Sequence, residues 1–307
     1  MKISISIPAY KRTYLKEAID SCLAQTNQDF ELIIVNDASP EDLDSIVNSY
    51  SDDRIRYYKN EKNCGAINVV DNWNKCLEYA TGDYVICMGD DDRLLPNCLE
   101  EYARLIEKYP GLGVYHAWTE IIDEKGDPKK ITVARPEYES VYSLIWHRMI
   151  CRNQQFIGDF LFDITRLRSN GGFYKLPLAW GSDDISVVIA AKPNGIANTQ
   201  TLTFQYRQNG ETITSTGNSQ IKVKALFQQK QWYDSFLLVQ PTNTLDLIYY
   251  NEIRLSINHY YKKQIANVVA NDFKSNILNI FVWIISGREV DRKTLLRAFF
   301  YYVLKLL

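Results

Sequence analysis

Tyr84-Val85-Ile86-Cys87-Met88-Gly89-Asp90-Asp91-Asp92 is the stretch from which the fold is inferred. Residues 84–88 form a short apolar run between Gly82-Asp83 and Gly89. This length and these flanks are typical of a strand buried on both faces, although a short apolar run alone does not exclude a helix. Three carboxylates follow at once, and each like-charged pair about 5 Å apart costs roughly 3 kcal/mol at an effective dielectric of about 20.

Two interpretations of this acidic triplet are open at this point. In the first, Asp90, Asp91 and Asp92 form a solvated turn before the helix that is expected after Pro96. In the second, they hold a divalent cation, because Mg²⁺ and Mn²⁺ prefer hard carboxylate oxygens. The strands around the triplet favour the second interpretation.

The composition is that of a folded globular protein, with 46% hydrophobic and 23% charged residues. A net charge of −2 gives no basic field, so we expect no nucleic-acid partner. Six cysteines without a Cys-x-x-Cys pair predict reduced, buried thiols in a cytosolic protein and no structural zinc. We expect no signal peptide, because a strand begins directly after Met1. The apolar run 277–285 is about half of the roughly 20 residues that a transmembrane helix needs.

Strands and helices alternate through the first part of the chain. This alternation predicts an α/β fold with an open, mostly parallel, doubly wound sheet and helices on both faces. Loops at the carboxyl ends of such strands meet in one crevice, which brings Asp37 to the edge that carries the acidic triplet. The expected strands are residues 3–7, 30–35, 55–58, 84–88 and 114–122, and the expected helices are residues 14–25, a helix opened by Ser39-Pro40, and residues 66–80, 96–108, 141–150 and 184–191.

From about residue 219 the pattern is wholly helical, with helices expected at 221–233, 245–261, 264–286 and 292–307. The last helix is strongly apolar and has Arg292, Lys293, Arg297 and Lys305 at its margins. Three partners are open for it: the rest of the chain, a second subunit in a homodimer, or the interface of an anionic membrane.

The first strand ends at Pro8-Ala9-Tyr10 and not at a glycine-rich phosphate loop. A dinucleotide dehydrogenase and a P-loop enzyme are therefore disfavoured. A diphosphate bound here would need another counter-charge, which a metal ion on the triplet would supply. Asp37 could accept hydrogen bonds from a base or a ribose, or it could be an ordinary turn residue.

Several motifs together resemble the inverting glycosyltransferases of family 2, which have the GT-A fold. The resemblance covers roughly the first 215 residues. The motifs, in order, are Pro8-Ala9-Tyr10, Val35-Asn36-Asp37-Ala38-Ser39, Asn63-Cys64-Gly65, Gly82-Asp83-Tyr84 running into Asp90-Asp91-Asp92, Gly171-Gly172-Phe173, Trp180-Gly181-Ser182-Asp183-Asp184 and Tyr206-Arg207.

The resemblance implies a GT-A-like catalytic domain over residues 1–215, with a nucleotide-sugar half (1–115) and an acceptor half (116–215), and a helical region over 216–307. It implies a hexosyltransferase-type enzyme that uses Mn²⁺ or Mg²⁺. The donor would be a nucleotide-sugar, usually a UDP-sugar, and the acceptor a glycan or lipid-linked hydroxyl in surface polysaccharide synthesis. We expect a cytoplasmic protein, with peripheral attachment to the inner face of the membrane as the alternative.

The resemblance also implies roles for individual residues. Asp37 would read the uracil, Asp90 and Asp91 would face ribose and diphosphate, and Asp91 or Asp92 would bind the metal. Asp184, next to Asp183, would be the base that takes the acceptor proton. The remaining nucleotide-binding candidates are Pro8, Ala9, Tyr10, Arg12, Asn63 and Arg207.

Three departures from the family pattern matter. Gly89 stands where an aspartate is common, which leaves the register of the metal ligand open by one residue. Asp183-Asp184 replaces the usual Glu-Asp. Gln208-Asn209 stands where many members have a histidine ligand, so we expect no histidine on the metal. His116, His147 and His259 match no family motif and are interpreted as structural or surface residues.

Two other functions are weighed against this one. A sugar-phosphate nucleotidyltransferase would need a glycine- and lysine-rich first loop, which residues 8–12 do not resemble. A non-catalytic module that binds nucleotide-sugars or glycans would not need an intact set of Asp37, the acidic triplet and Asp184.

Overall fold

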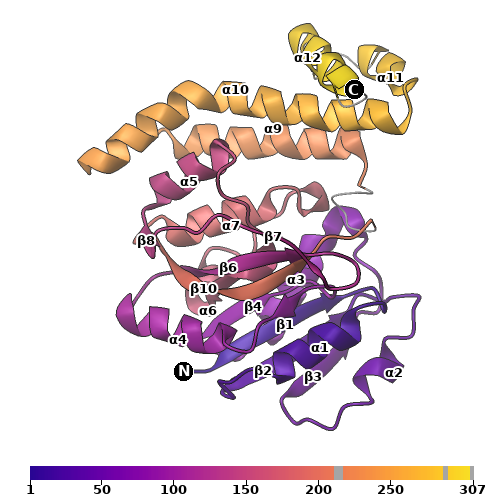
Figure 1. The fold of residues 1–307 in the computed structure, drawn as a ribbon, viewed down its shortest axis with the longest axis vertical. Coiled ribbons are helices and arrows are strands. Elements are labelled where there is room, and N and C mark those ends of the chain that lie inside the picture. Colours follow the sequence, from indigo (N-terminus) through magenta and orange to yellow (C-terminus); the bar gives the residue numbers. More distant parts are fainter. Residues whose placement is uncertain (211–216, 286–289, 305–307) are drawn as a thin grey trace.

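The computed structural model describes residues 1–210, 217–285 and 290–304 (Figure 1). A ten-stranded sheet forms its centre. The strands are β1 (Ile3–Ala9), β2 (Phe30–Asn36), β3 (Ile55–Lys59), β4 (Tyr84–Cys87), β5 (Arg93–Leu94), β6 (Val114–Ile122), β7 (Pro128–Ile131), β8 (Tyr138–Glu139), β9 (Phe160–Asp163) and β10 (Ile196–Arg207). Their order is β3-β2-β1-β4-β9-β6-β10-β5, with β7 beside β6 and β8 beside β10.

The helices surround this sheet and then continue beyond it as a separate helical layer (Figure 1). The α-helices are α1 (Leu15–Leu23), α2 (Asp44–Val47), α3 (Val69–Tyr79), α4 (Cys98–Lys108), α5 (Val141–Met149), α6 (Ile164–Ser169), α7 (Ser182–Ala191), α9 (Ser219–Phe236), α10 (Thr244–Ser275), α11 (Asn279–Ile285) and α12 (Arg292–Leu304). Short 3₁₀ turns are η1 (Ala66–Asn68), η2 (Ile157–Asp159) and η3 (Pro177–Ala179).

The sheet consists of a parallel half and a mixed half. Strands β3, β2, β1 and β4 are all parallel, as the alternating pattern predicts. Strand β9 then lies antiparallel between β4 and β6, and β6 is again parallel to β10. The predicted α/β fold class is confirmed, while the antiparallel insertion of β9 and the strand β10 are features that the sequence did not predict.

Alternate residues of the buried strands point to two separate cores. In β2, Leu32 and Ile34 pack with α1 and α4, whereas Ile33 and Val35 pack with α3 and α7. This period-2 division places helices on both faces of the sheet, because successive strand residues point to opposite sides. Burying each such side chain contributes about 1.5–3 kcal/mol, so both layers are stabilising.

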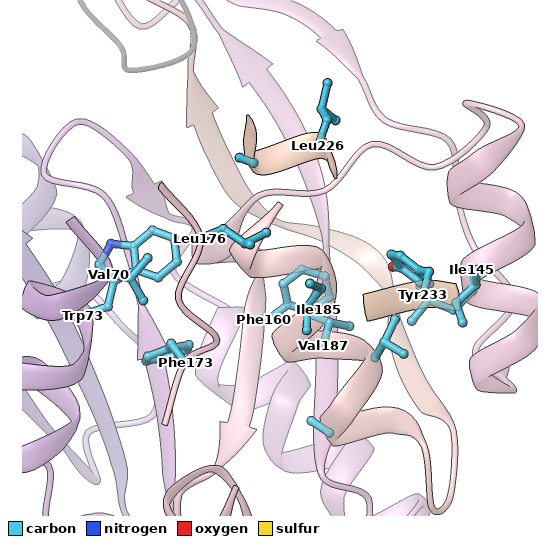
Figure 2. Close-up of a cluster of buried hydrophobic side chains, with 14 of the residues drawn as sticks. Val70, Trp73, Ile145, Phe160, Phe173, Leu176, Ile185, Val187, Leu226 and Tyr233 are labelled. Atoms are coloured by element: carbon cyan, nitrogen blue, oxygen red, sulfur yellow. The ribbon is translucent and has the colours of Figure 1, made fainter. Parts of the chain in front are cut away.

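The helical region after the catalytic motifs packs on one of these cores. Leu226 and Tyr233 of α9 join the cluster that contains Phe160 of β9 and Ile185 of α7 (Figure 2). Figure 1 shows α9 and α10 lying across α5 and α7, with α11 and α12 at the far end of α10. The predicted boundary between residues 215 and 216 falls in 211–216, outside the described residues.

Some predicted elements were wrong in extent. The helix expected at Ser39-Pro40 begins only at Asp44, because the Ser39 hydroxyl accepts the Glu41 N–H in a local turn. The helices expected at 245–261 and 264–286 are divided differently in the structure. Helix α10 continues without a break from Thr244 to Ser275, since no glycine or proline interrupts residues 258–268, and the remainder of the second expected helix is the separate helix α11. Between residues 123 and 140, for which no helix or strand was expected, the structure has two short strands, β7 and β8. Ser286 and residues 305–307 lie outside the described residues.

All six cysteines are free thiols, and none of them forms a disulfide. Cys22, Cys76, Cys87 and Cys98 are buried, as predicted, whereas Cys64 is half-buried and Cys151 is exposed. Across the described ranges, no helix combines the length and the apolar character needed to cross a membrane.

Candidate active site

The loop Gly89-Asp90-Asp91-Asp92, called the acidic loop below, follows the carboxyl end of β4. Asp90 ties this loop to the end of the neighbouring strand β1. Its Oδ2 accepts hydrogen bonds from the backbone N–H groups of Tyr10 and Lys11, both at 2.7 Å. The prediction that the strand ends share one edge is therefore confirmed for β1 and β4.

Asp91 and Asp92 each use one carboxylate oxygen for structure. Asn209 Nδ2 donates to Asp91 Oδ2 at 2.7 Å, and the Arg207 N–H donates to Asp92 Oδ1 at 2.9 Å. The other two oxygens, Asp91 Oδ1 and Asp92 Oδ2, would each lie 2.9 Å from a Cβ built on Gly89. Both oxygens thus converge on the space that glycine leaves open, and a side chain at position 89 would fill that space.

The electrostatics of the acidic loop are unfavourable for three ionised carboxylates. Burial and the charge of Asp91 raise the pKa of Asp90 to about 6 and that of Asp92 well above its usual value. Burial also raises the pKa of Asp91. A cation between Asp91 and Asp92 would reverse this effect, because it favours the ionised forms.

The oxygens of Asp91 and Asp92 fit a cation that is shared with a ligand. In the part of the chain that the structure describes, no group of three or more His, Cys, Asp or Glu side chains is arranged to hold a metal ion. Mg²⁺ is usually held by one or two carboxylates together with substrate phosphates and water. Two converging carboxylate oxygens are a donor set of this kind.

Arg207 lies beneath the acidic loop and is fully buried. Its Nε donates to the Asp91 carbonyl at 2.8 Å and its Nη2 to Glu17 Oε2 at 2.7 Å, while its guanidinium stacks 4.2 Å from the Tyr14 ring. Its Nη1 donates to the carbonyls of Asp123 and Glu124. This geometry suits a residue that positions the acidic loop.

The other predicted nucleotide residues lie along the same edge. Asp37 N–H donates to the Ala9 carbonyl at 2.9 Å, which joins β2 to the end of β1 beside Pro8. The Asp37 carboxylate accepts from Cys64 N–H at 3.0 Å, and Asn63 Nδ2 donates to the Asp37 carbonyl at 2.8 Å.

Asp37 therefore organises residues 60–65 and still lies at the site edge. Asn60 Nδ2 also donates to its Oδ1, at 2.8 Å. Tyr10 and Arg12 are exposed, and the Arg12 backbone N–H donates to Glu41. Their exposed side chains are therefore accessible to a ligand at this edge.

The second acidic pair, Asp183-Asp184, lies in the first turn of α7, which begins at Ser182 directly after Gly181. Asp184 is only 7% exposed, and three side chains from other elements hold its carboxylate. Arg148 Nε donates at 2.8 Å, Gln155 Nε2 at 2.7 Å and Gln229 Nε2 at 3.1 Å.

Asp183 has the opposite environment. It is only half-buried, and no side chain of residues 1–210, 217–285 or 290–304 donates a hydrogen bond to it. Burial and the neighbouring charge of Asp184 raise the pKa of Asp183 to about 7. A carboxylate with such a pKa can take up a proton near neutral pH.

A buried carboxylate, Asp159, links the two acidic groups. Its Oδ2 accepts from Thr119 Oγ1 at 2.9 Å and from the Phe156 N–H at 3.2 Å. The charge of Asp159 also helps to raise the pKa of both Asp92 and Asp183, although burial and nearer charges have larger effects. Asp159 is thus one charge that both the acidic loop and the start of α7 experience.

Several residues of this site have no motif in the sequence. Arg148, Gln155 and Gln229 reach Asp184 from segments 29 to 45 residues away in the chain, so spacing could not indicate them. Asn209 carries a weak signal, because it follows Tyr206-Arg207 where a polar ligand is common in the resembling family.

Known proteins resemble this chain in sequence and in fold. An uncharacterized glycosyltransferase of Rickettsia typhi is 34% identical over 125 residues, which cover 40% of this chain and 38% of that protein. One of Methanocaldococcus jannaschii is 33% identical over 130 residues, which cover 41% of this chain and 44% of that protein. The matched region thus spans less than half the length of either relative.

Among solved structures, Staphylococcus aureus TarS residues 1–349 share the fold, with a TM-score of 0.62 over 88% of this chain and 80% of that chain. The sequences are 16% identical, so this likeness concerns the fold alone. The model of the family described as glycosyl transferase family 2 matches residues 4–167, more than half of the chain. These matches confirm the predicted family, and the chain belongs to glycosyl transferase family 2.

Proposed function

We propose that the chain is a metal-dependent inverting glycosyltransferase that moves a sugar from a UDP-sugar to a hydroxyl of a glycan or lipid-linked acceptor in surface polysaccharide synthesis. The observation that carries this proposal is the convergence of Asp91 Oδ1 and Asp92 Oδ2 beside Gly89 at the nucleotide edge of the sheet. The structurally similar TarS was solved in complex with UDP-GlcNAc, which supports a uridine donor.

Asp91 and Asp92 would hold Mn²⁺ or Mg²⁺ in this proposal. When bound, the metal would compensate the charge that develops on the departing diphosphate. Asn209 and Arg207 fix the outer oxygens of the two carboxylates and thereby aim the inner ones. Asp37 and the backbone of Pro8, Ala9 and Tyr10 would line the base and ribose.

Asp183 would take the acceptor proton. The acceptor oxygen then forms a bond to the anomeric carbon as the bond to the diphosphate breaks, and the electron pair of that bond leaves with the diphosphate. The family resemblance assigns the base to Asp184, but its oxygens are already held by a guanidinium and two amides. We therefore exchange the roles and propose that Asp184 positions the first turn of α7.

We also propose that the protein works in the cytoplasm. Six cysteines without a disulfide support a reducing compartment, because an exposed thiol such as that of Cys151 would be prone to oxidation elsewhere.

Titrating UDP with and without Mn²⁺, followed by assays of UDP-sugar turnover, tests the proposal. We expect Mn²⁺ to tighten UDP binding and the UDP-sugar to be consumed. Binding without turnover in the presence of candidate acceptors would indicate a binding module. Release of pyrophosphate from UTP and a sugar phosphate would indicate a nucleotidyltransferase.

Replacing Asp91 or Asp92 by Asn is expected to abolish the Mn²⁺-dependent tightening of UDP binding. Asparagine keeps the size and one acceptor oxygen but removes the charge that binds the metal. The fold should be retained, because losing a charge relieves repulsion within the acidic loop. Isothermal titration with and without Mn²⁺ measures the effect.

Asp53→Asn is the matched control for this pair, because Asp53 is exposed and distant from the acidic loop. It should bind UDP and Mn²⁺ as the unmodified protein does. Full metal-dependent binding in both the Asp91 and the Asp92 variants would refute the metal assignment.

Replacing Asp37 by Asn should weaken UDP binding by about 1–3 kcal/mol through the loss of a charge-assisted hydrogen bond to the base. Asn can still accept from the Cys64 N–H, so the 60–65 loop should stay in place. Isothermal titration checks the change, with Asp53→Asn again as control. An unchanged dissociation constant would mean that Asp37 serves the loop only.

A further inference from the structure

The helices α11 and α12 lie at the far end of the molecule, on the end of α10 (Figure 1). Each has already buried one face against α10. Trp283 of α11 is 3% exposed and donates its Nε1–H to Asp272 Oδ2 at 2.7 Å. Thr294 and Ala298 of α12 are buried, and Tyr302 packs edge-on against Phe273. Packing on α10 therefore accounts for the buried residues of α11 and α12, but not for the apolar residues on the faces that point away from α10.

The outward face of α12 is apolar at helical spacing. Its five large residues follow the i, i+3, i+4, i+7, i+8 pattern of a single stripe. Leu296 is 70% exposed and Phe300 is 60% exposed, so nothing in the described chain covers them. The stripe consists of Leu296, Phe299, Phe300, Val303 and Leu304.

The segment that includes α11 adds further exposed apolar side chains at the same end of the molecule. Ile285 is the most exposed of them. We call these side chains and the α12 stripe together the distal apolar surface, and apolar groups exposed in such number at one end of a molecule indicate an interaction site. The members from this segment are Ile277, Leu278, Phe281, Val282, Ile284 and Ile285.

The charges around the distal apolar surface are mostly positive. Among described residues between 276 and 304, Arg292, Lys293 and Arg297 are the cations and Asp291 is the acid. Asp291 is already occupied by the Thr294 hydroxyl and backbone N–H. A partner of negative charge is therefore complementary, whereas a second copy of this face would bring its own cations against these.

We propose that the distal apolar surface lies in the interface of a lipid bilayer that carries anionic headgroups. Helices with an apolar face and flanking Lys and Arg lie in the plane of the interface, with the apolar face about 5–10 Å deep. The apolar residues of α11 and α12 would enter the acyl boundary, and Arg292, Lys293 and Arg297 would meet the headgroups. This proposal is independent of the sugar-transfer chemistry.

Flotation with vesicles tests the proposal, using phosphatidylcholine alone and phosphatidylcholine with phosphatidylglycerol. We expect the unmodified protein to float with the anionic vesicles and Phe300→Asp to lose most of this binding. Leu255→Asp is the matched control, because Leu255 is 80% exposed on α10 outside the surface. The control should float as the unmodified protein does.

Lys293→Glu together with Arg297→Glu should reduce flotation with anionic vesicles. UDP binding by each variant reports that the fold is intact. No flotation of the unmodified protein, or equal loss in Phe300→Asp and Leu255→Asp, would overturn the proposal. A dimer that Phe300→Asp converts to a monomer, without any flotation, would assign the surface to a second copy instead.

Discussion

Asp183→Asn is expected to lower the rate of sugar transfer by roughly 10²- to 10⁴-fold, which is the usual contribution of a positioned base. Asparagine has the size of aspartate but cannot take the acceptor proton. UDP affinity with Mn²⁺ should change little, because the metal is assigned to the acidic loop. Transfer rate and UDP affinity, measured on the same preparation, separate the two effects.

The pH profile gives an independent check on Asp183. Burial raises its pKa to about 7, and only the ionised carboxylate can accept a proton. The transfer rate should therefore fall as the pH drops below about 7, and this acid limb should be missing from the residual activity of Asp183→Asn. Asp184→Asn should keep an acid limb but move it to lower pH, because the charge of Asp184 helps to raise the pKa of Asp183. A dead Asp184→Asn beside a fully active Asp183→Asn would return the base to Asp184.

Arg148→Met is expected to destabilise the protein by roughly 3 kcal/mol, because it leaves the buried Asp184 carboxylate without its cation. This figure is at the low end for breaking a buried pair, since the Arg148 side chain is itself 31% exposed. Chemical denaturation monitored by circular dichroism measures the change. The methionine preserves most of the apolar stem and removes the guanidinium.

Arg152→Met is the matched control for Arg148→Met, because Arg152 is exposed four residues further on. A surface substitution of this kind should change the free energy of unfolding by less than about 0.5 kcal/mol. If both variants lose equal stability, the ion pair with Asp184 is not what Arg148 contributes.

The parallel half of the fold and the edge with the acidic loop could be predicted, because short stretches of sequence indicate each of these strands and its end. The apolar run 84–88 predicted β4, and the strand-end argument placed Asp37 and the acidic triplet at one edge, where Asp37 and Asp90 both hydrogen-bond to the end of β1. The antiparallel β9 was not predictable in the same way. Its four residues fix no direction, which depends on pairing with β4 and β6 from elsewhere in the chain.

For the catalytic base, the sequence indicated the dipeptide Asp183-Asp184 but could not show which of the two carboxylates is free to act. Neighbouring helix residues point about 100° apart, so the two carboxylates meet different surroundings, and Asp184 is buried whereas Asp183 is half-buried. Which one is buried depends on Arg148, Gln155 and Gln229, and their approach is set by tertiary packing. The raised pKa of Asp183 has the same tertiary origin.

The contact between Gln229 and the start of α7 limits how modular this protein can be. The Gln229 amide lies where a Cβ on Gly181 would be, and it also bonds Asp184. A chimaera that joins residues 1–215 to the helical region of another family member would inherit an unmatched surface at the turn that presents Asp183. Two such enzymes could therefore exchange their carboxyl-terminal regions only if the residues at positions 181 and 229 came from the same parent protein.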